Sequence, residues 1–324
     1  MPSHKRLLNG TGELAKRKNE LWYRRRLRVI AEDMKDAVAT PLKQLLAGPH
    51  ASSDPVDPAE RAALAQQVAR VIADGRSRFE IPVDPQRTAT YAARMNLQAT
   101  DVWFAAQMKA VGIPITPAQL PQPQMDAFRH RPLGDAAPRR LTAAQLRARL
   151  RARARLGLGP VRGLATLGVI AGQGEIQAAF QAAVDSNVGL ITSIPDQYFD
   201  RMQEVMFDHM QSGQRWETLV GGLRDAIDDV NNLADYRVAL IARDQTSKMA
   251  ATFNEARTRS VGISQYTWQT AGDERVRESH AANDGQVFSF DTPPEETGNP
   301  GDDVNCRCVA IPYVEEAEGE EEAA

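Results

Sequence analysis

Apolar residues recur at helical spacing along most of this chain, and the pattern stops at Gly262. The segment from Leu233 to Arg259 carries a long stripe of this kind on one helix face. Gly262 suits a helix end, because glycine readily adopts the left-handed conformation found there. Beyond it the composition becomes that of short strands, at residues 263–270, 287–290 and 306–314. With 6% aromatic and 25% charged residues, the sequence predicts a mainly α protein with extended helical arms and a small α+β C-terminal domain.

Prolines, glycines and charge runs divide the chain into seven segments. They are a basic N-terminal helical arm (1–50), a helical region (51–111), a Pro-rich linker (112–138), an Arg-rich helix with a Gly-rich connection (139–184), a second helical region (185–260), a small α+β module (261–314) and an acidic tail (315–324). Within them we expect helices at residues 13–47, 59–75, 87–111, 175–194, 196–211, 216–227 and 233–259. The linker holds six prolines, so we expect an extended arm there and no packed element.

Charge is separated along the chain, although the net charge is only -3. Residues 1–35 hold ten Lys and Arg against four acids, residues 185–235 hold ten acids against three Arg, and residues 315–322 hold six Glu. Such blocks are common where a chain touches nucleic acid or neighbouring subunits. No N-terminal apolar run resembles a secretory signal, and no apolar stretch approaches the roughly eighteen residues that span a bilayer. We therefore expect a soluble protein without membrane association.

The only two cysteines, Cys306 and Cys308, lie two positions apart. A disulfide between them would close a strained ring, so reduced thiols are expected. On a strand the two side chains point to the same side, and His280, folded back from upstream, would give three ligands for Zn²⁺. Asp284 would complete a tetrahedron if residues 280–284 are helical. Two interpretations stay open: a closed structural zinc site, or two buried cysteines beside a hydrogen-bonded histidine.

Asp273, Arg275 and Arg277 form a second polar cluster. We expect Asp273 to cap a short helix and to pair with Arg277, four positions later. Our interpretation is a polar network that braces a small domain with little apolar core, and the alternative is that Arg275, Arg277 and His280 form a recognition or catalytic cluster. The sequence contains no nucleophile elbow, zinc-protease motif or phosphate loop, so no catalytic residue is assigned.

Five arginines alternate with apolar residues in the Arg-rich segment: Arg147, Arg149, Arg151, Arg153 and Arg155. On a helix this spacing spreads positive charge around most of the circumference. Such a helix suits a phosphate backbone or an acidic protein surface, and equally a solvated position outside a bundle. As nucleic-acid contacts, these arginines predict salt-dependent binding to double-stranded DNA without sequence preference.

The order of motifs over roughly residues 185–314 resembles the phage Mu F-like head morphogenesis family, whose members are minor head proteins of tailed bacteriophages. The residues that carry the resemblance are Arg237–Arg259, Tyr266–Thr270, Asp273–Arg277, His280, Asp284, Gly285, Pro300 and Cys306–Cys308. The resemblance makes residues 185–260 a head-morphogenesis region and residues 261–314 a Mu F-like module. Within the module it marks five structural motif residues: Trp268, Asp273, Arg275, Arg277 and Gly285.

What the resemblance implies is a role in assembly. Such proteins act in head morphogenesis, DNA packaging or genome delivery, in few copies, at the portal and in the head interior. The expected partners are portal and major capsid proteins and packaged DNA, and the expected location is the virion, with the host cytoplasm during assembly. The alternative function is a zinc-dependent hydrolase or nuclease that uses His280, Cys306 and Cys308, with Asp273 or Glu274 as general base. That enzyme would need an open metal position and a pocket.

Overall fold

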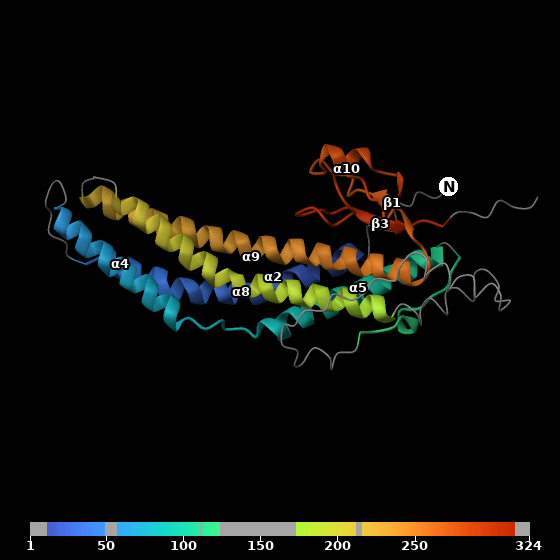
Figure 1. Cartoon of the computed structure of the whole chain (residues 1–324), viewed down its shortest axis with the longest axis horizontal. Helices are drawn as coiled ribbons and strands as arrows, with labels where there is room; N and C mark the ends of the chain where they lie inside the picture. Colours follow the sequence, from blue (N-terminus) through green and yellow to red (C-terminus); the bar gives the residue numbers. More distant parts are fainter. Residues whose placement is uncertain (1–11, 49–56, 111, 124–172, 212–215, 315–324) are drawn as a thin grey trace, which may run out of the picture. The chain divides into compact units, whose positions relative to one another are not determined.

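A computed structural model describes residues 12–48, 57–110, 112–123, 173–211 and 216–314, which form long helices and one small sheet (Figure 1). The helical elements are α2 (Gly12–Met34), the π-helix η1 (Lys35–Ala39), α3 (Thr40–Leu46), α4 (Pro58–Arg78), α5 (Pro85–Ala110), the 3-10 helix η2 (Pro117–Gln119), α8 (Gln173–Gln211), α9 (Trp216–Ser260) and α10 (Glu278–Ala282). The strands are β1 (Gln265–Gln269), β2 (Val287–Ser289) and β3 (Val309–Pro312). The expected fold class is confirmed.

The described residues fall into two compact units. One takes those within 1–19, 92–184 and 244–324, and the other takes those within 20–91 and 185–243. Because α2, α5, α8 and α9 each contribute residues to both, the units are not consecutive stretches of sequence. Among the described residues, no helix has both the length and the apolar character that crossing a membrane requires.

The predicted first helix is present as α2, η1 and α3 in direct succession, with one π-helical turn inside it. Beside that turn, Gly75 of α4 lies against Val38, and a Cβ on Gly75 would stand 2.4 Å from Val38 Cγ2. Glycine at this position therefore permits the close approach of α4. Leu64, Val68 and Ile72 bury the same face of α4 at helical spacing.

Two predicted helix boundaries are wrong, at Pro195 and near residue 230. Helix α8 continues through Pro195, where buried Ile194 and Phe199 on either side supply packing that offsets the lost backbone hydrogen bond. Helix α9 continues through residues 228–232, which are mostly polar and were predicted to separate two helices. Tertiary contacts hold that stretch, because Val230 is buried and Asn231 accepts a 2.9 Å hydrogen bond from the Tyr198 hydroxyl.

The described part of the Pro-rich segment, residues 112–123, is packed, contrary to the expected extended arm. Ile115 and Leu120 are buried in a cluster with Phe104, Met108 and Val261. The prolines prevent regular secondary structure here, but an irregular backbone can still place the side chains of Ile115 and Leu120 in the core. Residues 124–138 lie outside the described part of the chain.

Several acids of the 185–235 block pair with bases of the N-terminal helices in the second unit. Lys35 and Lys43 contact Asp235 and Asp228, at 2.7 and 2.5 Å respectively. Arg76 bridges Asp196 and Asp200, at 3.0 and 2.6 Å. These pairs are partly exposed, so each adds little stability, roughly 0–1 kcal/mol. Part of the charge separation in the sequence is therefore cancelled within the fold.

The sheet has the order β2-β1-β3, with both neighbours antiparallel to β1. Tyr266 on β1 faces Phe288 and Pro312, and Trp268 faces Ala310. The alternation of β1 buries Tyr266 and Trp268 completely, as a strand with one covered face requires. Figure 1 shows the sheet and α10 together as one small module after α9.

Candidate metal centre in the C-terminal module

The small core of the module contains both cysteines. It consists of Tyr266, Trp268, Phe290, Cys306, Cys308 and Ala310, with Phe288 packed against it. Both thiols are free and buried. Both cysteines therefore contribute to the apolar core of the module.

His280 brings α10 to the two thiols. Its side chain is only 3% exposed, and its ring meets the Trp268 ring edge-on at a centroid distance of 5.5 Å. His280 Nδ1 lies 3.3 Å from Cys308 Sγ and 3.7 Å from Cys306 Sγ. The three potential ligand atoms all lie within 4.8 Å of one another. A set of one imidazole and two thiolates is a donor set that Zn²⁺ favours.

Asp303 holds the far side of the same imidazole, and the sequence analysis did not single it out. Its Oδ2 lies 2.8 Å from His280 Nε2 and accepts a 3.0 Å hydrogen bond from Arg277. Arg277 also donates to the Val304 carbonyl at 2.8 Å. The two adjacent acids Asp302 and Asp303, just before Cys306, were the available sequence signal. Only the fold shows that the second of them reaches the histidine.

The cysteines do not lie on a strand, contrary to expectation, because β3 begins at Val309. They face the same core through a turn instead, in which Asn305 has a φ of 58°. The Asn305 N–H donates to Asp244 on α9 at 2.8 Å, which fixes the turn against the helix. Asparagine is one of the few residues that tolerates this left-handed conformation.

Each of the two thiols changes the pKa of the other. Their mutual hydrogen bond lowers the pKa of Cys306 to about 6 and raises the pKa of Cys308, while burial opposes the first shift and adds to the second. The Gly301 N–H, 3.4 Å from Cys306 Sγ, also favours the Cys306 thiolate. The contact between the two thiols therefore favours the thiolate at Cys306 and the thiol at Cys308. The thiolate is the form of cysteine that binds metals.

Asp284 does not join the three-residue group. Its Oδ1 accepts hydrogen bonds from the Thr270 N–H at 2.7 Å and from the Thr270 hydroxyl at 3.0 Å. Helix α10 ends at Ala282, so His280 and Asp284 do not share a continuous helical face. Gly285 follows with a φ of 79° and donates its N–H to the Trp268 carbonyl at 2.8 Å. Asp284 and Gly285 together close the turn between α10 and β2.

Asp273 binds Arg307, which is a different partner from the one predicted. Both guanidinium NH₂ groups of Arg307 donate to its carboxylate, and this hydrogen bonding lowers the pKa of Asp273 to about 2. Asp273 caps a tight turn, because its Oδ1 accepts from the Arg275 N–H at 3.2 Å, whereas α10 starts only at Glu278. The predicted helix cap and the predicted pair with Arg277 are both wrong. A carboxylate held in this way is a weak general base, and Glu274 is exposed.

The module is joined to α9 by specific contacts within the first unit. Asn254 Nδ2 donates to the Ala310 carbonyl at 2.7 Å and is itself buried. Gly301, with a φ of 103°, lies so close to α9 that a Cβ would stand 2.3 Å from Ala251 Cβ. The motif residues and the preceding helix therefore form one structural block.

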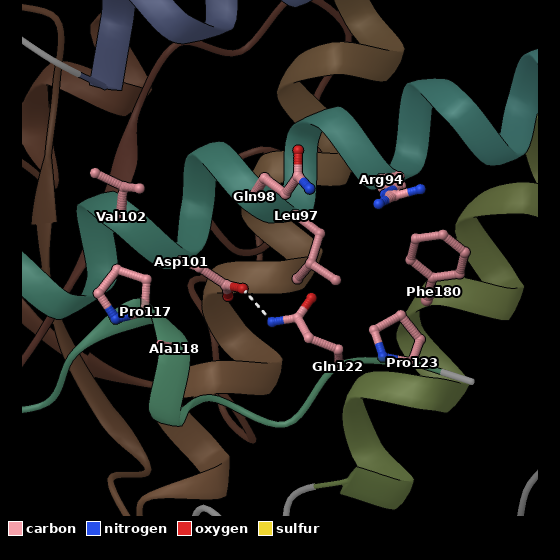
Figure 2. Close-up of a pocket in the computed structure, with 10 residues that line it drawn as sticks. All are labelled: Arg94, Leu97, Gln98, Asp101, Val102, Pro117, Ala118, Gln122, Pro123 and Phe180. Carbon is pink, nitrogen blue, oxygen red and sulfur yellow. Dashed lines mark hydrogen bonds between the residues drawn. The ribbon is translucent and has the colours of Figure 1, made fainter. Parts of the chain in front are cut away.

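A cavity of about 430 Å³ lies elsewhere in the same unit, between α5, residues 117–123 and Phe180. Figure 2 shows Asp101 of α5 joined to Gln122 across it, by a hydrogen bond of 2.8 Å. Arg257 holds the same carboxylate in a buried ion pair, at 2.7 Å. Asp101 is thus engaged in packing the unit, and the lining residues that the structure describes hold no nucleophile beside a base. The five arginines from Arg147 to Arg155 lie outside the described residues.

A sequence model of the family described as "Phage Mu protein F like protein" matches residues 200–311, from within α8 to β3. This match confirms the resemblance for that part of the chain. A protein of Haemophilus influenzae (strain Rd), described as "Uncharacterized protein", is 42% identical over 144 residues, which make up 44% of this chain and 31% of the relative. The match thus spans about a third of the relative's length. No solved structure matches the chain.

Proposed function

Because residues 200–311 match the phage Mu protein F-like family, we propose that this protein is a minor head protein of a tailed bacteriophage that acts in head morphogenesis. The match is the observation that carries the proposal. It covers the acidic helices, the polar turn and the cysteine motif in one continuous block. In this proposal the protein works in the virion, in the head interior or at the portal vertex, and passes through the host cytoplasm during assembly.

The role is structural and not enzymatic. Asp273 is bound to Arg307, Asp284 to Thr270 and Asp303 to His280, so the carboxylates around the cysteine cluster already have partners. His280, Cys306 and Cys308 are at most 8% exposed. A hydrolase would need an open metal position facing a substrate, and this arrangement supports that alternative poorly.

An exposed stripe on α9 supports a protein partner. Asp225, Asp229, Leu233 and Tyr236 follow helical spacing on one face, and Leu233 and Tyr236 are 52% and 61% exposed. Aromatic and aliphatic residues flanked by charge are typical of interface anchors. We propose that the portal protein binds this stripe, and that the major capsid protein is a further partner.

DNA is the second proposed partner, through basic residues without sequence preference. On α2, Arg25, Arg26 and Arg28 are exposed. They are separate from Lys35 and Lys43, which pair with acids of α9. Together with the arginines from Arg147 to Arg155, they offer positive charge to a phosphate backbone.

Mature heads, purified from cells that carry the encoding phage, test the proposal. A tagged chain should copurify with heads in fewer copies than the major capsid protein, and disruption of its gene should remove infectivity. Its absence from particles, with infectivity unchanged, would overturn the head assignment.

Co-expression with the portal protein of the same phage tests the stripe. Leu233→Asp and Tyr236→Asp should each reduce copurification at least tenfold, because a charge would be buried at the contact. The control is Val102→Asp, which changes an exposed apolar residue (54%) on α5. Equal loss in all three variants, or in none, would contradict the assignment of this face.

A further inference from the structure

The distances around His280 match the spacing of ligands in a tetrahedral zinc site. With Zn–S bonds of about 2.3 Å and Zn–N bonds of about 2.0 Å, sulfur and nitrogen ligands at a tetrahedral angle stand about 3.5 Å apart. His280 Nδ1 lies 3.3 and 3.7 Å from the two sulfurs. The donor atoms are therefore close to coordination distance without any backbone movement, although they come from α10 and from the segment before β3.

The contact with Asp303 prepares the histidine to be a ligand. A carboxylate at 2.8 Å from Nε2 favours the tautomer with its proton on that nitrogen. Nδ1 then presents its lone pair to the thiols. Carboxylate–histidine–metal arrangements of this kind fix the ring orientation and raise the basicity of the ligating nitrogen. Arg277 in turn holds Asp303, at 3.0 Å, so the orientation is supported by a further side chain.

Backbone and indole N–H groups surround the sulfurs. The Gly301 N–H approaches Cys306 Sγ at 3.4 Å, a contact that stabilises a thiolate. The indole of Trp268 is fully buried, and its N–H is a hydrogen-bond donor to the Cys308 thiol, where it favours the thiolate. Two N–H donors, one from the backbone and one from an indole, therefore favour negative charge on the sulfurs.

A bound metal would add stability to a module as small as this one. Below roughly 70–80 residues, a single apolar core seldom supplies enough stability, and small domains often add a metal. Here the buried core consists of six residues, two of which are the cysteines. A metal held by His280, Cys306 and Cys308 would join α10 to the segment that leads into β3.

We propose that His280 Nδ1, Cys306 Sγ and Cys308 Sγ bind one Zn²⁺ ion that staples the C-terminal module, with Asp303 as the positioning residue behind His280. Asp284, which is held by Thr270, and Asp303, which faces the opposite ring nitrogen, lie outside the ligand set. The burial of all three ligand residues suits a structural ion. This inference concerns the isolated chain and does not rest on the proposed role in the phage head.

The test begins with elemental analysis of the full chain, purified under reducing conditions and supplied with Zn²⁺. We expect about one zinc per chain, and loss of that zinc in Cys306→Ser/Cys308→Ser and in His280→Ala. The matched control is His209→Ala, a histidine on α8 whose Nδ1 contacts the Val205 carbonyl at 3.0 Å, and it should keep the metal. Asp284→Ala should keep it too, since Asp284 is outside the ligand set.

Cobalt substitution keeps the test decisive if the cysteine variants fold poorly. The Co²⁺-loaded wild-type chain should show thiolate-to-cobalt charge-transfer absorption and the intense visible bands of tetrahedral cobalt. Asp303→Asn should preserve these bands and weaken zinc affinity by about 10–100-fold, as expected for a partner that orients a ligand. Retention of zinc by the cysteine variants would overturn the proposal. A folded wild-type chain that takes up neither zinc nor cobalt would overturn it as well.

Discussion

Arg257 on α9 and Asp101 on α5 form a two-point ion pair in the interior of the first unit. Arg257 Nε and Nη2 donate to the two carboxylate oxygens at 2.7 and 3.1 Å. The side chains are 0% and 4% exposed. Gln122 donates to the same carboxylate, so α5, α9 and the segment after α5 meet at one buried charge.

Removing one partner of this pair should destabilise the protein strongly. Asp101→Leu leaves a buried guanidinium without its counter-charge, which costs about 3–5 kcal/mol. The double variant Asp101→Leu/Arg257→Met should lose less than the single one, because no unpaired charge remains. Urea denaturation of the three proteins measures the difference. A double variant less stable than Asp101→Leu would contradict this account of the pair.

Close approach at Gly301 should make the module sensitive to one methyl group. Gly301→Ala would place a Cβ 2.3 Å from Ala251 Cβ at a φ of 103°, so it combines a clash with backbone strain. We expect a loss of about 2–4 kcal/mol from strain and overpacking together. Gly285→Ala is the control, because it has a φ of 79° but nothing within 4 Å, and should cost only about 1–2 kcal/mol. Thermal unfolding of both variants compares the two effects, and equal losses would show that contact with α9 is unimportant.

The Asp273–Arg307 pair should make the module weaken in acid. Arg307 lowers the pKa of Asp273 from 3.8 to about 2, so the folded state favours the carboxylate. The resulting stabilisation is present above the unfolded pKa of 3.8 and is lost as pH falls from 3.8 toward 2. Amide hydrogen exchange in β1 should report this change. In Asp273→Asn, protection should already be lower at neutral pH and should vary less over the same acid range.

Binding to DNA should depend on salt through the arginines from Arg147 to Arg155. Each phosphate contact contributes about 0.9 to the slope of log affinity against log salt, so replacing all five arginines with glutamine should reduce that slope by about 4–5. Fluorescence anisotropy with a duplex of arbitrary sequence measures it. Arg70→Gln, at an exposed position on α4, should change the slope much less. An affinity that does not vary with salt would exclude DNA as a partner.

The helical spacing of apolar residues predicted most of the fold, because it shows which face of each helix is buried. The spacing of Leu64, Val68 and Ile72 is enough to define the buried face of α4. Periodicity could not predict that α9 continues through residues 228–232. A polar stretch interrupts the apolar pattern, and the residues that hold it in the helix are distant in the sequence. Tyr198, which contacts Asn231, is 33 positions away.

The candidate site divides in the same way. The sequence alone determined the donor types: two cysteines two positions apart, a histidine upstream and a set of acids and arginines nearby. The tertiary structure decided their partners. In the structure, Asp303 contacts His280 Nε2, Asp284 accepts hydrogen bonds from Thr270, and Asp273 pairs with Arg307.

The physical reason is the difference between local and non-local contacts. Glycine conformation, strand alternation and helix spacing depend on a few consecutive residues, so they can be read along the chain. The pair of Arg257 with Asp101 spans 156 positions and depends on how α5 and α9 pack. The sequence therefore predicted most of the elements and the chemistry that they carry, whereas only folding determined which charges and ligands would meet.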